Sequence, residues 1–384
     1  MRQQMLEILR LISISDSIGQ PVEMYTRENI MQNMDQYLHK FPRRSSPYDI
    51  GCAPGEYTDD TQMSIALARY LLKLEVKEDK AFHFESFMQD LLSVYDEDAI
   101  EKGVERGGHG SFQKIATFEG DRIKYQKEVN QKLFEKGNVL IENNMNIGNG
   151  SGMRLGPFIA VDLAREVLTE HLIGQTISTH ANVIAVIANI LLVNLYKGLN
   201  CGLIGPVNVF KYCIHWLTEY LTPFTYYTES LSKTKKIYKK LIKDMPCIGD
   251  FDNAITFYIG YLVTISMMPK CNKDLSNIDH LKISLENAKQ CKEKEGLGMP
   301  CSALATFGWF IYLINNLDSC DNLEEIVRRC LMVGGDTDTL LVYTYPISYI
   351  LFNRGKEVKE ELPDYIMDQL KESNIDLLDK RLGL

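Results

Sequence analysis

The chain has 384 residues, of which 45% are hydrophobic and 24% charged, a globular composition with enough apolar material for a large core. Its formal net charge of −9 argues against a general nucleic-acid-binding surface. Its nine cysteines include no C-x-x-C pair, and the odd number favours free thiols in a reducing compartment.

The first residues, MRQQMLEILRLIS, carry Arg2, Glu7 and Arg10 where a secretory signal requires an apolar stretch, so we expect no signal peptide. The most apolar run, residues 181–196, contains three asparagines and is shorter than the roughly 20 residues that span a bilayer. It predicts a buried helix and not a membrane span. We therefore expect a soluble, cytoplasmic protein.

Apolar side chains recur at helical spacing through most of the chain, for example in residues 63–74. Pro363 suits the first turn of a late helix. Neither a hairpin pattern nor a β-α-β rhythm is present, so the sequence predicts an all-α fold. Further helices are predicted at residues 3–14, 81–95, 158–170, 181–197, 205–221, 251–267, 302–316, 322–332 and 338–352.

The chain contains no linker rich in Pro, Gly or Ser and no repeat, which favours one domain over residues 1–384. Residues 225–300 differ in composition and are expected to form an excursion on the surface. This region includes SKTKKIYKKLIK, residues 232–243, with six lysines. A solvated helix face or loop is a better interpretation of these lysines than a patch for an acidic partner.

Two Thr/Asp tetrads stand at the entrances of predicted helices, T-D-D-T at 58–61 and D-T-D-T at 336–339. Each tetrad alone is explained by helix capping, because Thr and Asp accept hydrogen bonds from the first turn. If the two helix starts converge, their four carboxylates would repel one another unless a cation neutralised them. Oxygen ligands without His or Cys favour Mg²⁺, Mn²⁺ or Ca²⁺, and this number of carboxylates suggests two ions.

Glycine clusters mark three loops, R-G-G-H-G at 106–110, G-N-G-S-G-M-R at 148–154 and V-G-G-D-T-D-T at 333–339. Glycine permits positive φ angles and lets a ligand approach the backbone closely, although a single cluster can also be a simple turn. The clusters therefore become informative only in combination with the acidic tetrads.

The order of these motifs resembles the ADP-ribosylglycohydrolase family. The resemblance runs from about residue 10 to about residue 350, and the pair of acidic tetrads is its most specific part. It is carried by D-S-I-G-Q-P-V-E (16–23), T-D-D-T (58–61), R-G-G-H-G (106–110), G-N-G-S-G-M-R-L-G-P (148–157), T-H (179–180) and G-G-D-T-D-T (334–339).

The resemblance implies an all-helical orthogonal bundle with two Mg²⁺ ions in a central cleft, where Mn²⁺ can substitute. The metal ligands that it implies are Thr58, Asp59, Asp60, Asp336, Asp338 and Thr339. The catalytic residues that it implies are Glu23, Asp60 and Asp338, with Glu23 as a mobile glutamate near the metals. The ADP-ribose-binding residues that it implies are Gly107, Gly108, Gly110, Gly148, Asn149, Gly150, Ser151, Gly152, Met153 and His180.

The roles of three residues, His180 among them, can be interpreted in more than one way. His180, at the start of an apolar helix, is either a ligand contact or a capping residue. Arg154 either binds phosphate or pairs with a neighbouring acid. Asp16 is expected to organise the loop before Glu23 and not to bind metal itself. The chain has Ser15-Asp16 where the family usually has Gly-Asp, and His109 where relatives often have an aromatic residue.

The implied function is a hydrolase that removes ADP-ribose from a modified protein, releasing ADP-ribose, and acts as a monomer without nucleic-acid or membrane partners. Arginine and serine adducts require the same metals, and we favour arginine. The alternative is a non-catalytic ADP-ribose-binding or immunity-type protein, which would be expected to have lost a metal ligand. An aspartate-nucleophile phosphatase is disfavoured, because Gly334-Gly335 and not an apolar strand precede Asp336.

Overall fold

A computed structural model describes residues 1–41, 52–76, 78–102, 106, 111–135, 147–218, 228–284 and 298–383. Over these residues the protein contains helices and two isolated β-bridges but no strand, which confirms the predicted all-α fold. The α-helices are α1 (Arg2–Gly19), α2 (Arg27–Lys40), α3 (Asp59–Val76), α4 (Phe84–Lys102), α5 (Ser111–Ala116), α6 (Arg122–Glu135), α7 (Arg165–Thr179), α8 (Val183–Asn200), α9 (Val209–Thr218), α10 (Thr228–Leu241), α11 (Phe251–Ser266), α12 (His280–Ser284), α14 (Ala303–Asn315), α15 (Leu323–Val333), α16 (Thr337–Phe352), α17 (Asp364–Met367) and α18 (Ile375–Leu382).

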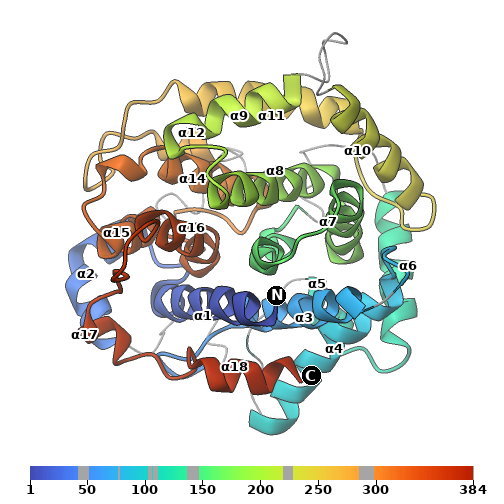
Figure 1. The fold of residues 1–384 in the computed structure, drawn as a ribbon, viewed down its shortest axis with the longest axis horizontal. Helices are drawn as coiled ribbons and strands as arrows, with labels where there is room; N and C mark the ends of the chain where they lie inside the picture. The colour runs from blue at the N-terminus through green and yellow to red at the C-terminus, as the bar shows by residue number, and fades with distance from the viewer. Residues whose placement is uncertain are drawn as a thin grey trace.

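The centre of the protein is formed by helices that are far apart in sequence. Helix α1 packs against α16 and α3, and α8 packs against α7, α14 and α16. In Figure 1 these helices occupy the middle of the view, while α2, α6, α10 and α18 lie along its edge. One hydrophobic core cluster extends from Met5 in α1 to Leu382 in α18. The prediction that the whole chain is one domain stays a prediction.

Several predicted helices agree with the structure to within a residue or two, including α11, α14, α15 and α16. The helix predicted at 158–170 is wrong over its first part, because a 3-10 helix (η3, Gly156–Ala160) is followed by non-helical residues before α7 begins at Arg165. The η3 residues are all buried, and they contact α1, α3 and α8. Their apolar character therefore reflects burial on several sides and not one face of a helix.

Helix α8 is the buried helix that the sequence predicts at 181–197. By length and hydropathy alone α8 could cross a membrane, but 83% of the tested segment is buried inside the protein. Its surroundings are other helices of the same chain. The core helix of a globular protein has the same composition.

The described part of the region expected to be a surface excursion contains α10, α11 and α12. Helix α10 packs against α7, α11 packs against α8 and α9, and α12 packs against α14. Three lysines of α10 form ion pairs with neighbouring acids: Lys233 with Glu166, Lys235 with Asp252 and Lys240 with Glu170. These contacts favour the solvated-face interpretation of the basic segment.

Gly19, the last residue of α1, allows α1 to approach the start of α16. A Cβ atom at Gly19 would lie 2.3 Å from Asp338 Cα and 2.6 Å from Asp338 N. We expect Gly19→Ala to lower the free energy of unfolding by about 2–4 kcal/mol, because the backbone of α16 would have to move. Urea denaturation measures this change. Gly260→Ala in α11 is the matched control, since nothing lies within 4 Å of its Cβ position. Equal effects of the two substitutions would contradict the close approach.

Candidate metal centre

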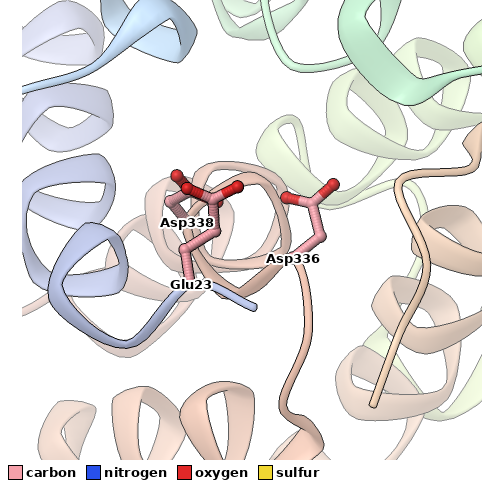
Figure 2. A group of neighbouring side chains, drawn as sticks. All are labelled: Glu23, Asp336 and Asp338. Atoms are coloured by element: carbon pink, nitrogen blue, oxygen red, sulfur yellow. The ribbon is translucent and has the colours of Figure 1, made fainter. Parts of the chain in front are cut away.

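Three carboxylates from two distant segments meet at the start of α16. Glu23, Asp336 and Asp338 can each place one oxygen so that the three oxygens lie within 4.8 Å of one another. Figure 2 shows Glu23 on the segment that follows α1, beside Asp338, with Asp336 on the other side of the helix entrance. Asp336 and Asp338 are buried, whereas Glu23 is partly exposed.

Backbone hydrogen bonds join the two segments. Met24 N donates to Gly335 O at 2.7 Å, and Gly335 N donates to Tyr25 O at 3.1 Å. On the other side, Asp336 N donates to Met299 O at 3.0 Å. Gly335 has a φ of 74°, and a Cβ atom there would lie 2.1 Å from Met299 O. The glycine before Asp336 is therefore required both by the backbone conformation and by the close packing.

The second tetrad is not explained by capping. Asp336 is the N-cap residue of α16, but its side chain makes no capping hydrogen bond. Instead, its Oδ2 atom accepts a hydrogen bond of 2.7 Å from Asn149 Nδ2, whose amide group also donates to Thr306 Oγ1 at 3.0 Å. Asn149, which we expected to bind ADP-ribose, thus fixes the orientation of a predicted metal ligand. The side-chain type alone gave no signal of that role.

The first tetrad is held by Asp16. Its Oδ2 atom accepts from Thr58 N, Thr61 N and Thr61 Oγ1 at 2.9, 2.9 and 2.6 Å, and its Oδ1 atom accepts from Thr58 Oγ1 at 2.7 Å. Asp16 in α1 therefore satisfies the first turn of α3, the role that a capping side chain usually performs. It organises the loop at 58–61, and not the loop before Glu23 as the sequence suggested. This arrangement leaves Asp59 and Asp60 without a capping task.

The two tetrads lie close enough to change one another's protonation. Burial raises the pKa of Asp60 well above its usual value, and the charges of Asp16, Asp59 and Asp336 raise it further. Burial and the charges of Glu23, Asp60 and Asp336 likewise raise the pKa of Asp338. The sequence prediction required such convergence of the helix starts, and the structure brings them together.

The available oxygens fit a hard divalent cation. Asp60 Oδ1 is buried and has no hydrogen-bond partner in the described part of the chain. Such an orphaned carboxylate oxygen is costly unless a cation binds it. Thr58 Oγ1 donates its proton to Asp16 and accepts from Asp60 N at 3.4 Å, which leaves one lone pair for a cation. The Thr339 hydroxyl lies at hydrogen-bonding distance from the Asp60 carboxylate. Oxygen ligands of this kind are those of Mg²⁺, Mn²⁺ or Ca²⁺.

Cys301 lies beside the same carboxylates, a neighbour that the sequence analysis missed. Its side chain is exposed, and the surrounding protein atoms together with the charges of Asp336 and Glu23 raise the pKa of its thiol above the usual value. No local motif around Cys301 indicates this position, because only the fold brings residue 301 next to residue 336.

The second glycine loop lies next to the metal centre. Residues Asn149–Ser151 form a 3-10 turn, in which the amides of Gly152 and Met153 both donate to Asn149 O. Gly148 and Gly150 contact the His180 ring, and Ser151 and Met153 are buried. The predicted ribose-binding residues Gly107, Gly108 and Gly110 lie outside the described residues.

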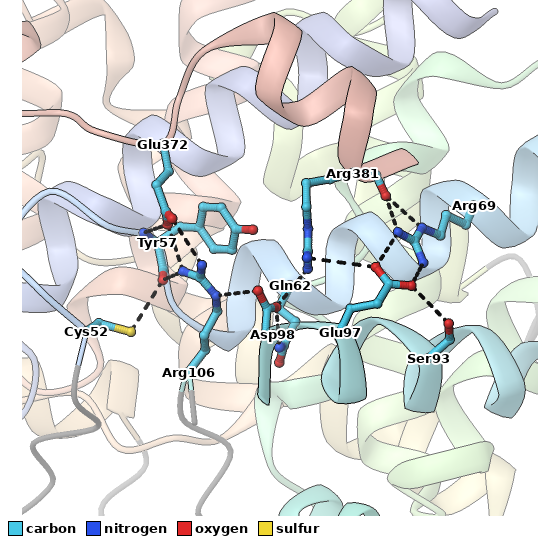
Figure 3. Close-up of polar contacts among 10 residues, drawn as sticks. All are labelled: Cys52, Tyr57, Gln62, Arg69, Ser93, Glu97, Asp98, Arg106, Glu372 and Arg381. Atoms are coloured by element: carbon cyan, nitrogen blue, oxygen red, sulfur yellow. Dashed lines mark hydrogen bonds and ion pairs between the residues drawn. The ribbon is translucent and has the colours of Figure 1, made fainter. Parts of the chain in front are cut away.

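The C-terminal segment reaches the first tetrad through buried ion pairs (Figure 3). Arg106 pairs with Asp98 at 3.0 Å and with Glu372 at 2.7 Å, and all three side chains are buried. Arg106 Nη1 also donates to Tyr57 O at 2.7 Å, while Asp59 N donates to Arg106 O at 2.9 Å. Glu372 therefore helps to hold the backbone that presents Asp59.

An all-helical protein that gathers carboxylates at two helix starts is a candidate metallohydrolase. The chain belongs to the ADP-ribosylglycohydrolase family, whose model matches residues 6–341 and confirms the resemblance found in the sequence. Comparison with curated proteins gave no match. Among solved structures, the chain is similar to one described as "ADP-ribosylglycohydrolase-related protein complex", with 16% identity, a TM-score of 0.46, and coverage of 99% of this chain and 97% of that one.

Membership of the family supports a divalent-metal-dependent hydrolase with an ADP-ribosylated substrate and ADP-ribose as product. The roles of the individual site residues, the identity of the metal and the linkage that is cleaved stay predictions.

Proposed function

We propose that the protein removes ADP-ribose from a modified arginine side chain with the help of two Mg²⁺ ions. The observation that carries this proposal is the cluster of Glu23, Asp336 and Asp338, with Asp60 of the first tetrad near enough to interact with Asp336 and Thr339 and its Oδ1 atom orphaned. A catalytically silent relative would be expected to lack part of this set. Here every predicted metal ligand is present, and the described contacts orient several of them.

The residues that would hold the metals are Thr58, Asp59, Asp60, Asp336, Asp338 and Thr339. When bound, Mg²⁺ supplies Lewis acidity and orients oxygen groups at the reacting ribose carbon. Asn149 keeps the Asp336 carboxylate in place, and Asp16 keeps the backbone of the first tetrad in place. These contacts fix the ligands before substrate arrives, which reduces the reorganisation needed during the reaction.

Glu23 differs from the buried aspartates because it is partly exposed and follows a short 3-10 turn, η1 (Gln20–Val22). This position suits a group that exchanges a proton with substrate or water, as cleavage of a glycosidic bond requires. The neighbouring residue, Met24, has a positive φ of 63° and is fixed by its hydrogen bond to Gly335. Glu23 is thus presented from a constrained turn at the edge of the metal centre.

The amides at the start of the 149–151 turn have no acceptor within the turn and suit an anionic diphosphate.

We also propose a cytoplasmic monomer that requires neither nucleic acid nor membrane. The cysteines in the described ranges are free thiols, in keeping with a reducing compartment.

The test is release of ADP-ribose from arginine-modified and serine-modified peptides, each with Mg²⁺ and with EDTA. We expect release from the arginine peptide that depends on Mg²⁺. Release from the serine peptide alone would correct the linkage but keep the hydrolase. Tight ADP-ribose binding by calorimetry, without release from either peptide, would support the non-catalytic alternative and overturn the proposed activity.

A further inference from the structure

Arg154 is a buried cation whose described partners are all neutral. Its Nε atom donates to Gln175 Oε1 at 2.7 Å, and its Nη2 atom donates to Gln175 O at 2.6 Å and to Thr179 Oγ1 at 2.8 Å. The guanidinium also lies over the Phe87 ring, 5.2 Å from its centroid. Within the described ranges Arg154 forms no ion pair, so the alternative of pairing with an acid is wrong there. Among the described residues no carboxylate compensates its positive charge.

The Thr179 hydroxyl links the Arg154 guanidinium to the His180 ring through two hydrogen bonds. Arginine can only donate, so Thr179 Oγ1 must accept from Arg154. Its own proton then points to His180 Nδ1, 2.9 Å away. Thr179 is fully buried, and among the described residues its hydroxyl forms hydrogen bonds only with Arg154 and His180. If His180 carried a proton on Nδ1, the Thr179 proton would be buried without an acceptor, which is unfavourable.

With Nδ1 accepting, the neutral His180 ring must carry its proton on Nε2. That atom faces the glycine loop, 3.2 Å from the position that a Cβ atom would take at Gly148 and 3.1 Å from that at Gly150. His180 is partly exposed, whereas its neighbours Thr179 and Ala181 are buried. Although part of its side chain is exposed, desolvation by the surrounding protein atoms and the charge of Arg154 lower the pKa of His180 to about 3, so the ring is neutral near pH 7.

We propose that Arg154 and Thr179 are positioning residues that hold His180 as the Nε2-protonated neutral tautomer, and that this N–H donates to an anionic oxygen of the ligand's diphosphate. The inference rests on the proposed function, because the diphosphate belongs to ADP-ribose. The neutral His180 N–H can donate to an anion, and the buried positive charge of Arg154 behind it favours that anion without placing an exposed charge in the cleft. Arg154 thus acts through other residues and does not contact phosphate itself.

The tautomer can be measured without any ligand. Long-range ¹⁵N–¹H NMR spectra distinguish the two neutral forms, and loss of one signal set in His180→Gln assigns His180. We expect the Nε2-protonated form in the wild type and in Thr179→Ser, which keeps the hydroxyl. Thr179→Val, which removes it, is expected to populate the Nδ1-protonated form. Thr344→Val, a buried exchange of the same kind in α16, serves as the control and should leave the wild-type tautomer. An Nδ1-protonated wild type would overturn the relay.

Ligand binding tests the second half of the inference. Calorimetry with ADP-ribose is expected to show roughly tenfold weaker binding to Thr179→Val, and unchanged binding to Thr179→Ser and Thr344→Val. Adenosine, which lacks the diphosphate, should bind all four proteins equally. Equal loss for both ligands would mean a general disturbance of the site and would overturn the diphosphate contact. Failure of the wild type to bind ADP-ribose would overturn that contact together with the proposed function, whereas the NMR result would still decide the relay.

Discussion

Replacement of Asp60 or Asp336 by asparagine is expected to abolish release of ADP-ribose while the helical fold stays intact. Asp60 is buried with one oxygen unpartnered, and Asp336 is oriented by Asn149. An amide is a weaker ligand for a hard cation than a carboxylate, so either exchange should remove metal binding. Metal ions contribute several kcal/mol to the transition state of such reactions, so we expect a loss of about 10³-fold or more.

Calorimetry with Mg²⁺ and a thermal melt in EDTA separate metal loss from unfolding. The Asp60→Asn protein should bind Mg²⁺ weakly but melt in EDTA at or above the wild-type temperature. The reason is that the exchange removes one of several mutually repelling buried charges. Asp379→Asn, in an exposed ion pair with Arg2, is the control and should change neither quantity. Activity of Asp60→Asn equal to wild type, with and without EDTA, would sink the two-metal interpretation.

Asp16→Ala is expected to lower the free energy of unfolding by about 2–5 kcal/mol and to weaken Mg²⁺ binding as well. The substitution leaves four buried donors of the 58–61 segment without their acceptor. Part of this loss is offset, because burial raises the pKa of Asp16 and the charged carboxylate is itself costly to bury.

Urea denaturation and Mg²⁺ calorimetry measure both consequences of the Asp16 exchange. Asp16→Asn keeps one acceptor oxygen and should fall between Ala and wild type. Asp321→Ala removes a highly exposed aspartate and should stay within about 0.5 kcal/mol of wild type. If Asp16→Ala kept wild-type stability, the carboxylate could not be what holds the first tetrad.

The parts of the fold that the sequence predicted well are those coded locally. Helical spacing located α11, α14, α15 and α16, and the composition of residues 181–196 predicted the buried helix α8. The two tetrads were recognised because carboxylates at a helix start are unusual when they occur twice. The error at 158–170 arose because an apolar run buried on several sides has the same composition as a helix face.

The contacts of some site residues join distant positions and are not predictable from local sequence. Asn149, predicted to bind ligand, also orients Asp336, 187 positions away. Arg154 donates hydrogen bonds to Gln175 and Thr179. Hydrogen-bond partners of this kind are set by how helices pack, and no local pattern records them.

The family match ends earlier in this chain than the residues that pack into its core. The family match ends at residue 341, inside α16, whereas Glu372 and Arg381 form buried ion pairs with Arg106 and Asp98. A fragment cut at that boundary would lose the rest of α16 and both C-terminal partners of the buried Arg106–Asp98 pair, which is strongly destabilising. Inactivity of such a fragment would thus report a collapsed scaffold beneath Asp59, and would carry no information about the chemistry of the metal centre.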